Sequence, residues 1–208
     1  MTGPRTGARR RRAPFKTLAL VLLVAALVAP AVLSQKGSRR RVARAPRRPD
    51  VAYIPTPPET VEEMLRQARL TPADVLYDLG SGDGRIPVRA AEAYGVRAVG
   101  IEIDPALVAQ AQENARRAGV SHLVTFRAGD IYREDLRGAT VVTLYLSDTI
   151  NLSLRPKLLR ELRPGARIVS HDFRMGDWKP ERAVRVPWRN LYRTVYVWTV
   201  PRDGRINK

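Results

Sequence analysis

The chain contains no cysteine. This absence excludes disulfide bonds, thiolate nucleophiles and cysteine-ligated zinc, although it does not select a cellular compartment. At 208 residues the chain is long enough to bury one full hydrophobic core. We therefore expect one folded domain that carries an appendage.

Acidic residues are almost absent from residues 1–50, which hold 13 Lys and Arg against the single acid Asp50. The remaining residues hold 24 Lys and Arg (37 minus 13) against 19 Asp and Glu (20 minus 1), a formal charge of only +5. The net charge of +17 is therefore concentrated near the N-terminus. Because the rest of the chain also lacks a basic groove with interleaved aromatics, we do not expect DNA or RNA as a partner.

Charged side chains are absent from residues 17–33, a run of 17 mostly apolar residues between two arginine-rich clusters. As a helix this run would measure about 25 Å at roughly 1.5 Å per residue, against a hydrocarbon core of about 30 Å. We expect a single N-terminal transmembrane helix here, with the flanking arginines at the lipid headgroups. The alternatives are a cleaved export signal with a small-residue site at Ala29-Pro30-Ala31 and a helix buried in the domain.

Four segments follow from these patterns. We expect a basic tail over residues 1–16, the transmembrane anchor or signal segment over 17–33, a basic linker over 34–50 and the folded domain over 51–208. Charge does not decide the orientation of the anchor, because six Lys and Arg precede it and seven follow it.

Strand-like and helix-like patterns alternate along the folded part. Apolar strand-like runs occupy residues 74–79, 97–103, 123–128, 140–146 and 166–172, and helical patterns occupy 85–95, 105–119 and 150–162. Residues 183–188 and 191–200 are separated by a short turn and predict an antiparallel hairpin at one sheet edge. The predicted fold class is α/β, with a doubly wound, mostly parallel, seven-stranded sheet covered on both faces.

A further helix is predicted ahead of the first strand. It would start at Thr56, because prolines follow at the first helical positions and Glu59 stands three residues later. Thr60 with Glu63 offers an alternative start. The apolar residues of this segment fall at helical spacing and predict a buried face: Val61, Met64, Leu65 and Ala68.

Three glycines stand at alternate positions directly after the first predicted strand: Gly80, Gly82 and Gly84. Glycine lets the backbone approach a ligand closely at the first strand-to-helix turn. The spacing differs from the dinucleotide pattern GxGxxG, and no Gly-Lys-Ser/Thr follows, so a phosphate loop is not predicted. Asp78 at the end of the strand and Asp83 in the loop would repel an anion and favour a ligand that carries positive charge.

Acids also follow the next two predicted strands. Glu102 lies 22 residues after Gly80 (102 minus 80), at the position from which an acid accepts hydrogen bonds from both ribose hydroxyls of an adenosine. Asp130 ends the third strand and could accept from an adenine amino group, while Ile131 packs against the ring. Together with the loop, these residues predict a cation-bearing nucleoside as ligand.

The motifs YDLGSGDGRI, GIEIDP, AGDIY and LRPGARIVSHDF resemble, in order and spacing, those of class I S-adenosylmethionine-dependent methyltransferases. The resemblance covers about 150 residues, nearly the whole folded part. It implies that S-adenosyl-L-methionine is the cofactor and that no metal is needed. It further implies that Gly80 and Gly82 line the methionine part, that Asp78 or Asp83 meets its amino group or the waters around it, and that Glu102 and Asp130 hold ribose and adenine. We also expect Ser81 and Gly84 to bind the cofactor.

A narrower resemblance rests on the apolar N-terminal segment together with YIPTP, LYL, RPKLLRELRPGARIVSHDF and DWKP. This combination resembles the membrane-associated protein-lysine methyltransferases that modify the ATP synthase c subunit and the adenine nucleotide translocase. It implies a lysine acceptor on a membrane-embedded protein. The alternatives are methylation of a small molecule or lipid, and a cofactor-binding membrane adaptor without catalysis. Because S-adenosylmethionine is made in the cytosol, we expect the domain on the cytosolic side.

The acceptor side is less strongly specified. The Asp/Asn-Pro-Pro-Tyr/Phe stretch of many amide and adenine methyltransferases is missing, and LYLS stands in its place. We expect Tyr145 and Asp148, after the fourth strand, to be the catalytic residues, and Tyr53, Thr56 and His171 to line the substrate pocket. The alternatives are a core role for Tyr145, a helix cap for Asp148 and a buried strand-end role for His171.

Overall fold

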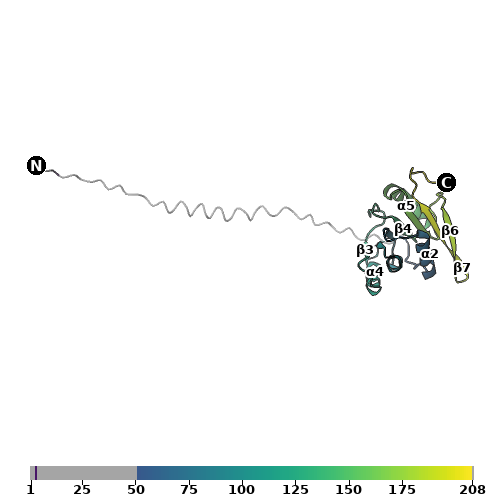
Figure 1. The fold of residues 1–208 in the computed structure, drawn as a ribbon, viewed down its shortest axis with the longest axis horizontal. Coiled ribbons are helices and arrows are strands. Elements are labelled where there is room, and N and C mark those ends of the chain that lie inside the picture. The colour runs from purple at the N-terminus through teal and green to yellow at the C-terminus, as the bar shows by residue number, and fades with distance from the viewer. Residues whose placement is uncertain (1–2, 4–50, 208) are drawn as a thin grey trace. The chain divides into compact units, whose positions relative to one another are not determined.

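The computed structural model describes Gly3 and residues 51–207 (Figure 1). Apart from Gly3, the predicted basic tail, transmembrane segment and linker lie outside the described residues. Within the described part of the chain, no helix is long and apolar enough to cross a membrane.

The seven strands form one sheet in the order β3-β2-β1-β4-β5-β7-β6. Their bounds are β1 Val75–Leu79, β2 Arg97–Glu102, β3 Val124–Ala128, β4 Val141–Leu144, β5 Arg167–His171, β6 Arg182–Trp188 and β7 Leu191–Thr199. The first five strands pair in parallel, whereas β7 pairs antiparallel with β5 and β6 antiparallel with β7. The predicted fold class and the edge hairpin are confirmed.

Helices cover both faces of this sheet, as its apolar strands predict. Helices α2 (Pro58–Ala68), α3 (Arg85–Tyr94) and α4 (Pro105–Arg117) lie on one face, and α5 (Asp148–Glu161) lies on the other. Successive strand residues enter different cores: Leu76 packs with α2, α3 and α4, whereas Tyr77 packs with α5. The result is a three-layer domain with two cores.

The predicted start of the first described helix is wrong. Helix α2 begins at Pro58 after Pro57, and no side chain caps it. Thr56 instead forms a hydrogen bond with His171. Thr60, the alternative start, does not cap the helix either, because its Oγ1 is buried without a hydrogen-bond partner among the described residues. The proline at the first turn sets the backbone without a capping side chain.

The buried face of α2 is as predicted. Val61, Met64, Leu65 and Ala68 are all buried, and Met64 and Leu65 are fully so. Each large apolar side chain buried in this way contributes about 1.5–3 kcal/mol relative to its exposed state.

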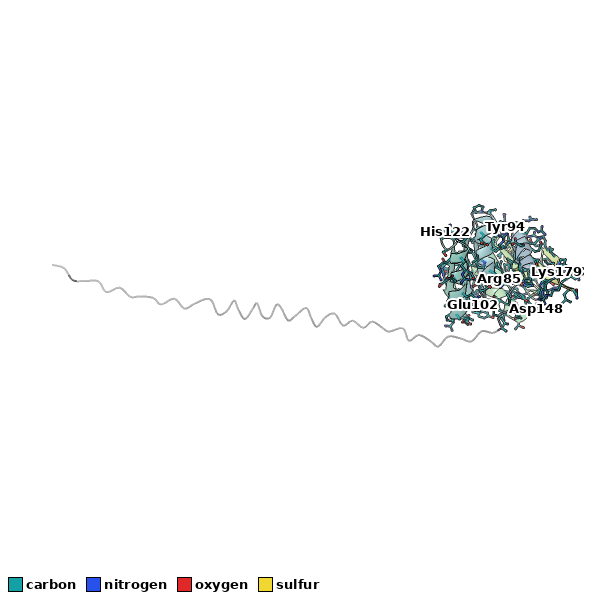
Figure 2. The ribbon with its side chains drawn as sticks, turned by 90° about the horizontal axis from the view of Figure 1, so that it is seen from below. Arg85, Tyr94, Glu102, His122, Asp148 and Lys179 are labelled. Atoms are coloured by element: carbon teal, nitrogen blue, oxygen red, sulfur yellow. The ribbon has the colours of Figure 1, made fainter. Side chains whose placement is uncertain are left out.

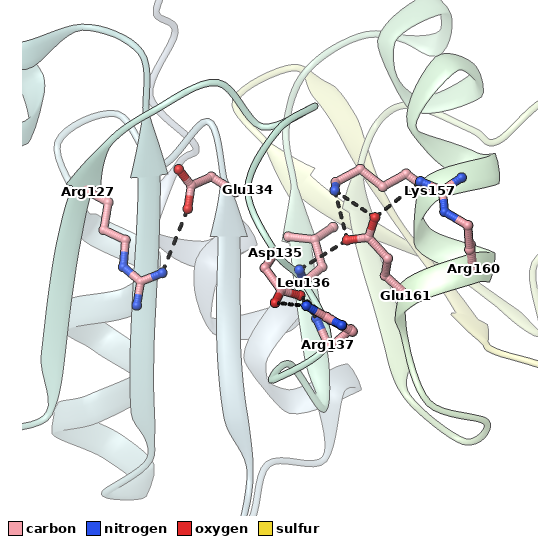
Figure 3. A network of polar contacts seen from close by, with 8 residues as sticks. All are labelled: Arg127, Glu134, Asp135, Leu136, Arg137, Lys157, Arg160 and Glu161. Carbon is pink, nitrogen blue, oxygen red and sulfur yellow. Dashed lines mark hydrogen bonds and ion pairs between the residues drawn. The ribbon is translucent and has the colours of Figure 1, made fainter. Parts of the chain in front are cut away.

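A polar network fixes the loop between β3 and β4 (Figure 3). Glu161 on α5 accepts from Lys157 Nζ at 2.7 Å and from the backbone N–H of Leu136 at 3.2 Å. Arg127 on β3 and Glu134 in the loop lie 3.7 Å apart. These contacts attach the middle of the loop, at Glu134 and Leu136, to β3 and α5.

Candidate functional site

A cavity of about 490 Å³ lies at the carboxyl ends of β1, β2, β3 and β4. Residues 51–56, which we call the cover segment, form part of its wall. Ten of the predicted site residues line the cavity: Tyr53, Thr56, Asp78, Gly80, Ser81, Asp83, Glu102, Asp130, Ile131 and Tyr145. Their expected roles stay predictions, but the structure brings them together. Gly82, Gly84, Asp148 and His171 are not among the lining residues.

Figure 2 shows the edge at which the cavity lies. Glu102, at the end of β2, and Asp148, at the start of α5, lie toward one end of the domain. Tyr94, at the end of α3, and His122, before β3, lie toward the other. In an open α/β sheet the carboxyl ends of the strands are the usual place for a ligand.

The glycine loop is tight because the cover segment lies directly against it. Gly82 has φ +53°, and a Cβ at this position would lie 2.3 Å from Cε2 of Tyr53. Gly84 has φ +79°, and its Cβ would collide with Phe126 and Ala111. Gly82 therefore allows the cover segment to approach the loop, whereas Gly84 allows α3 and α4 to pack together.

Glu102 is 7% exposed and links β2 to the glycine loop. Its Oε2 accepts from the backbone N–H of Gly82 at 2.9 Å, and its Oε1 accepts from those of Ile103 and Asp104 at 2.7 Å and 3.0 Å. These bonds hold the carboxylate in one orientation at the cavity wall. A carboxylate oxygen can accept further hydrogen bonds, so a ribose diol can still be bound.

Asp78 is the most deeply buried acid of the cavity, at 3% exposure. Burial raises the pKa of Asp78 to about 7; the hydrogen bond from Thr143 Oγ1, at 2.7 Å, opposes this shift, and the nearby carboxylates of Glu102 and Asp83 add to it. Among residues 51–207 no cation lies within ion-pair distance of Asp78. A bound ammonium group would supply the missing positive charge.

Asp83 is already paired. Arg85 donates from Nε and Nη2 to its two carboxylate oxygens at 2.9 Å and 2.7 Å. Burial opposes the effect, but the Arg85 guanidinium holds the pKa of Asp83 below its usual range. Arg85 also donates from Nη1 to the backbone oxygen of Thr56 at 2.9 Å, so it joins the loop to the cover segment. The sequence offered no signal for this role of Arg85.

The third strand end carries the adenine-side residues. Asp130 accepts from the backbone N–H of Tyr132 at 3.0 Å and lies 3.7 Å from Arg133 Nε. Ile131 is partly buried against the α5-side core. Both residues line the cavity, as expected from their position after β3.

Tyr145 lines the cavity and belongs to an aromatic stack. The rings of Tyr145 and His171 stack with centroids 3.8 Å apart, and Phe173 continues the stack at 5.9 Å from Tyr145. Burial raises the pKa of Tyr145, an effect that Arg193 opposes and Asp172 reinforces. Tyr145, which lines the cavity, is therefore a neutral phenol at neutral pH.

His171 lies beneath Tyr145 and is fully buried rather than part of the cavity wall. Its Nδ1 is 3.3 Å from Thr56 Oγ1, and its Nε2, which has no hydrogen-bond partner among the described residues, is 3.4 Å from Asp172 Oδ2. Burial lowers the pKa of His171 to about 4; Asp172 opposes this shift and Arg193 adds to it. His171 is thus a neutral ring that supports Tyr145 from below.

Asp148 is exposed at the first turn of α5 and does not line the cavity. Its Oδ1 accepts from the backbone N–H of Arg174 at 2.7 Å. Helix α5 is capped by Ser147, which accepts from the backbone N–H of Ile150 at 3.2 Å. In this structure Asp148 ties the loop after β5 to α5, and its expected catalytic role stays a prediction.

The comparisons with known proteins agree with this geometry. The family model of the ANTKMT methyltransferase domain matches residues 78–182, which run from the acid before the glycine loop to the start of β6. The chain belongs to this methyltransferase family. It is therefore an enzyme that transfers methyl groups, and S-adenosylmethionine is its methyl donor.

Relatives cover the domain to different extents. A protein-lysine N-methyltransferase of Saccharolobus islandicus is 40% identical over 153 residues, which are 73% of this chain and 95% of that protein. The adenine nucleotide translocase lysine N-methyltransferase of Mus musculus is 39% identical over 74% of this chain and 65% of its own length. The chain therefore spans only about two thirds of the mouse relative.

Among solved structures, that of an RNA methyltransferase from Salinibacter ruber in complex with S-adenosyl-L-homocysteine is 54% identical. The match between the two structures covers 71% of this chain and 94% of the Salinibacter ruber chain, with a TM-score of 0.67. The cavity described above fits this type of cofactor. It brings together acids from three successive strand ends: Asp78, Glu102 and Asp130. No group of three or more His, Asp or Glu in the described part of the chain could hold a metal ion.

Proposed function

We propose that this methyltransferase modifies the side-chain nitrogen of a lysine in a membrane-associated protein. The observation that carries the proposal is the similarity to a protein-lysine N-methyltransferase of which the chain covers 95%. The apolar, arginine-flanked residues 17–33 support the membrane location, with the domain on the cytosolic side, where the methyl donor is made.

The cofactor contacts are proposed from the charges in the cavity. Asp78 receives the methionine ammonium group, because Asp83 is already neutralised by Arg85. Glu102 receives the ribose hydroxyls from an orientation that three backbone N–H groups hold. Asp130 and Ile131 bind the adenine edge and face.

S-adenosylmethionine, when bound, supplies a methyl group on a positively charged sulfur. A lysine nitrogen can form the new bond only as a neutral amine, because it needs its lone pair; the carbon–sulfur bond breaks and sulfur keeps that electron pair. The usual lysine pKa is about 10.4, so the site must favour the neutral form. The Tyr145 wall removes water from the amine, which lowers the lysine pKa so that its proton passes to the solvent before the nitrogen reacts. The phenol oxygen accepts an N–H of the neutral amine and aligns the nitrogen.

RNA is the second candidate acceptor. The observation in its favour is the 54% identity to the Salinibacter ruber protein that is named an RNA methyltransferase. The charge of only +5 on residues 51–208 argues against it, because nucleic-acid sites depend on a strong positive potential.

The test is incubation of the full chain with methyl-labelled S-adenosylmethionine and three fractions of its own cell: membranes, total RNA and extracted lipid. We expect label in a membrane protein and a methylated lysine in its mass spectrum. Label confined to RNA or to lipid would refute the lysine proposal. Cofactor binding without label in any fraction would instead identify a non-catalytic adaptor.

Two matched variants make the result specific. Gly82→Ala places a methyl group against Tyr53, whereas Gly119→Ala has a similar φ of +73° but meets nothing within 4 Å. We expect Gly82→Ala to lose the label and Gly119→Ala to keep it. Loss in both variants would show that the assay reports stability rather than the site.

A further inference from the structure

The hairpin of β6 and β7 extends past the end of the sheet at which the cavity lies. The last residue of β5, His171, pairs with Val195, and β7 begins four residues earlier at Leu191. At about 3.3 Å per residue, this overhang measures roughly 13 Å. We call residues 185–193 the hairpin tip.

The hairpin tip is attached to the end of β5, next to the aromatic stack of Tyr145. We call Tyr145 and the rings that support it the acceptor wall. Asp172, directly after His171, accepts from the backbone N–H of Thr194 at 2.7 Å and from Arg193 Nη1 at 2.9 Å. Any surface that contacts the tip would therefore lie next to the aromatic stack of the cavity.

The tip exposes apolar side chains that pack on no core. Leu191 and Tyr192 are 63% and 56% exposed. Leu191 pairs with Trp188, and Tyr192 pairs with Pro187. Because paired residues share a face and neighbouring pairs alternate, Trp188 and Leu191 lie on one face of the ribbon and Pro187 and Tyr192 on the other.

The tip is also strongly basic. Residues 185–193 contain three arginines and no Asp or Glu. All three lie over aromatic rings: Arg185 over Tyr192 at 4.1 Å, and Arg193 and Arg189 over Trp188 at 4.3 Å and 4.8 Å. Arg193 is already bonded to Asp172, so Arg185 and Arg189 are the arginines of the tip that we assign to phosphate.

The chain enters the domain at the same sheet edge. The first described residues, 51–56, line the cavity, and residues 34–50 ahead of them carry seven Lys and Arg and only one acid. A membrane anchor at residues 17–33 would therefore limit the distance between this edge and the membrane to the length of the linker, residues 34–50. Fully extended, that linker measures at most about 60 Å. Exposed aromatic and aliphatic side chains beside arginines suit the interface of an anionic bilayer.

We propose that the hairpin tip binds the anionic phospholipid headgroups of a membrane and so directs the cavity toward that membrane. The proposal rests on the membrane location proposed above and not on lysine as the acceptor. RNA is the less favoured partner of this surface, because the stacked arginines already occupy the ring faces on which bases would stack.

The test uses the full chain and vesicles whose acyl chains carry bromine, which quenches nearby tryptophan fluorescence. The other two tryptophans, Trp178 and Trp198, are 4% and 0% exposed, so W188F gives the background signal. Vesicles of phosphatidylcholine with phosphatidylglycerol are compared with vesicles of phosphatidylcholine alone. Flotation of the vesicles reports separately whether the N-terminal segment holds the chain on them.

We expect quenching of Trp188 in the anionic vesicles only, and its loss in R185Q/R189Q and at high salt. The matched control is R116Q/R117Q, which removes the same charge from exposed positions on α4 that pair with Glu113. Retained binding of S-adenosylhomocysteine shows that each variant is folded.

Three outcomes would overturn the proposal. The first is quenching of the full chain that does not exceed that of W188F in either kind of vesicle. The second is quenching that is equally strong in vesicles of phosphatidylcholine alone. The third is quenching in R185Q/R189Q that equals that of the unchanged protein. A further measurement replaces the vesicles by labelled single-stranded RNA. RNA binding that falls in R185Q/R189Q, with no quenching by vesicles, would assign the hairpin tip to nucleic acid. None of these readouts depends on methyl transfer, so the acceptor proposal is tested independently.

Discussion

The two walls of the cavity are built in different ways. On the cofactor wall, Glu102 is held by backbone N–H groups: that of Gly82, 20 residues away, and those of Ile103 and Asp104, which follow it directly. The acceptor wall depends on distant side chains: Thr56 and His171, 115 residues apart, meet beneath Tyr145. Backbone hydrogen bonds hold Glu102 on the first wall, whereas the packing of aromatic rings holds Tyr145 on the second. Substitutions can separate these two parts.

The largest effect is expected for Gly82→Ala on the cofactor wall. The new methyl group would lie 2.3 Å from Tyr53 at a φ of +53°, so the loop and the cover segment must separate. A displacement of about 1 Å in such a site costs roughly 100-fold in activity. Calorimetry with S-adenosylhomocysteine measures the accompanying loss of affinity. Affinity within a factor of about two of that of Gly119→Ala would contradict a tight cofactor loop.

Tyr145→Phe tests the acceptor wall alone. The stack on His171 is kept, but the phenol that faces the cavity is lost. We expect kcat to fall about 10- to 100-fold, as for the loss of a hydrogen bond worth 1.5–3 kcal/mol, with little change in cofactor affinity. Tyr94→Phe, at the far end of α3, is the control. If Tyr145→Phe weakened cofactor binding and left kcat unchanged, Tyr145 would belong to the cofactor wall.

Asp78→Asn tests whether the buried acid binds a cation. The folded pKa, about 7, lies above the reference value of 3.8, so the folded state holds a proton between these values that the unfolded state lacks. The Asp78 contribution to the free energy of unfolding therefore falls as pH rises through this window and is constant above about 7.

An ammonium ligand prefers the carboxylate form of Asp78. Cofactor affinity should therefore rise with pH through about 7, by up to about ten-fold per pH unit below that value. We expect Asp78→Asn to remove this slope, to bind more weakly at pH 8 and to unfold there at a higher temperature. Calorimetry and thermal unfolding between pH 5 and pH 9 measure both effects. If cofactor affinity still rose with pH in Asp78→Asn, the pH dependence would belong to another titrating group.

Thr56→Val should have the smallest effect. It removes the hydroxyl that pairs with His171 Nδ1 and leaves a buried ring nitrogen without a partner, which costs about 1–3 kcal/mol of stability. Thr60→Val is the matched control, because Thr60 Oγ1 is equally buried and has no hydrogen-bond partner in the described part of the chain. Urea unfolding compares the two variants. An equal loss in both would show that the link between Thr56 and His171 is not stabilising.

Much of the fold could be predicted because its signals are local. Gly95 and Gly119 close two helices at φ +64° and +73°, and Pro105 begins one of them, as the sequence indicates. The start of α2 could not be predicted in the same way. Thr56 has the residue type of a helix cap, but it bonds to His171 from another strand, and this contact exists only in the folded domain.

The sequence by itself determined the α/β order and the edge hairpin, because each depends on residue types at short, regular spacings along the chain. The methyl donor followed from the resemblance of the successive strand-end motifs to those of a known family. The tertiary structure decided which acid is left for a cation, since Arg85 neutralises Asp83 and not Asp78. It also placed His171 behind Tyr145 rather than in the cavity, and the hairpin tip beside the acceptor wall. These features depend on side chains from distant strands that come together only when the sheet has formed.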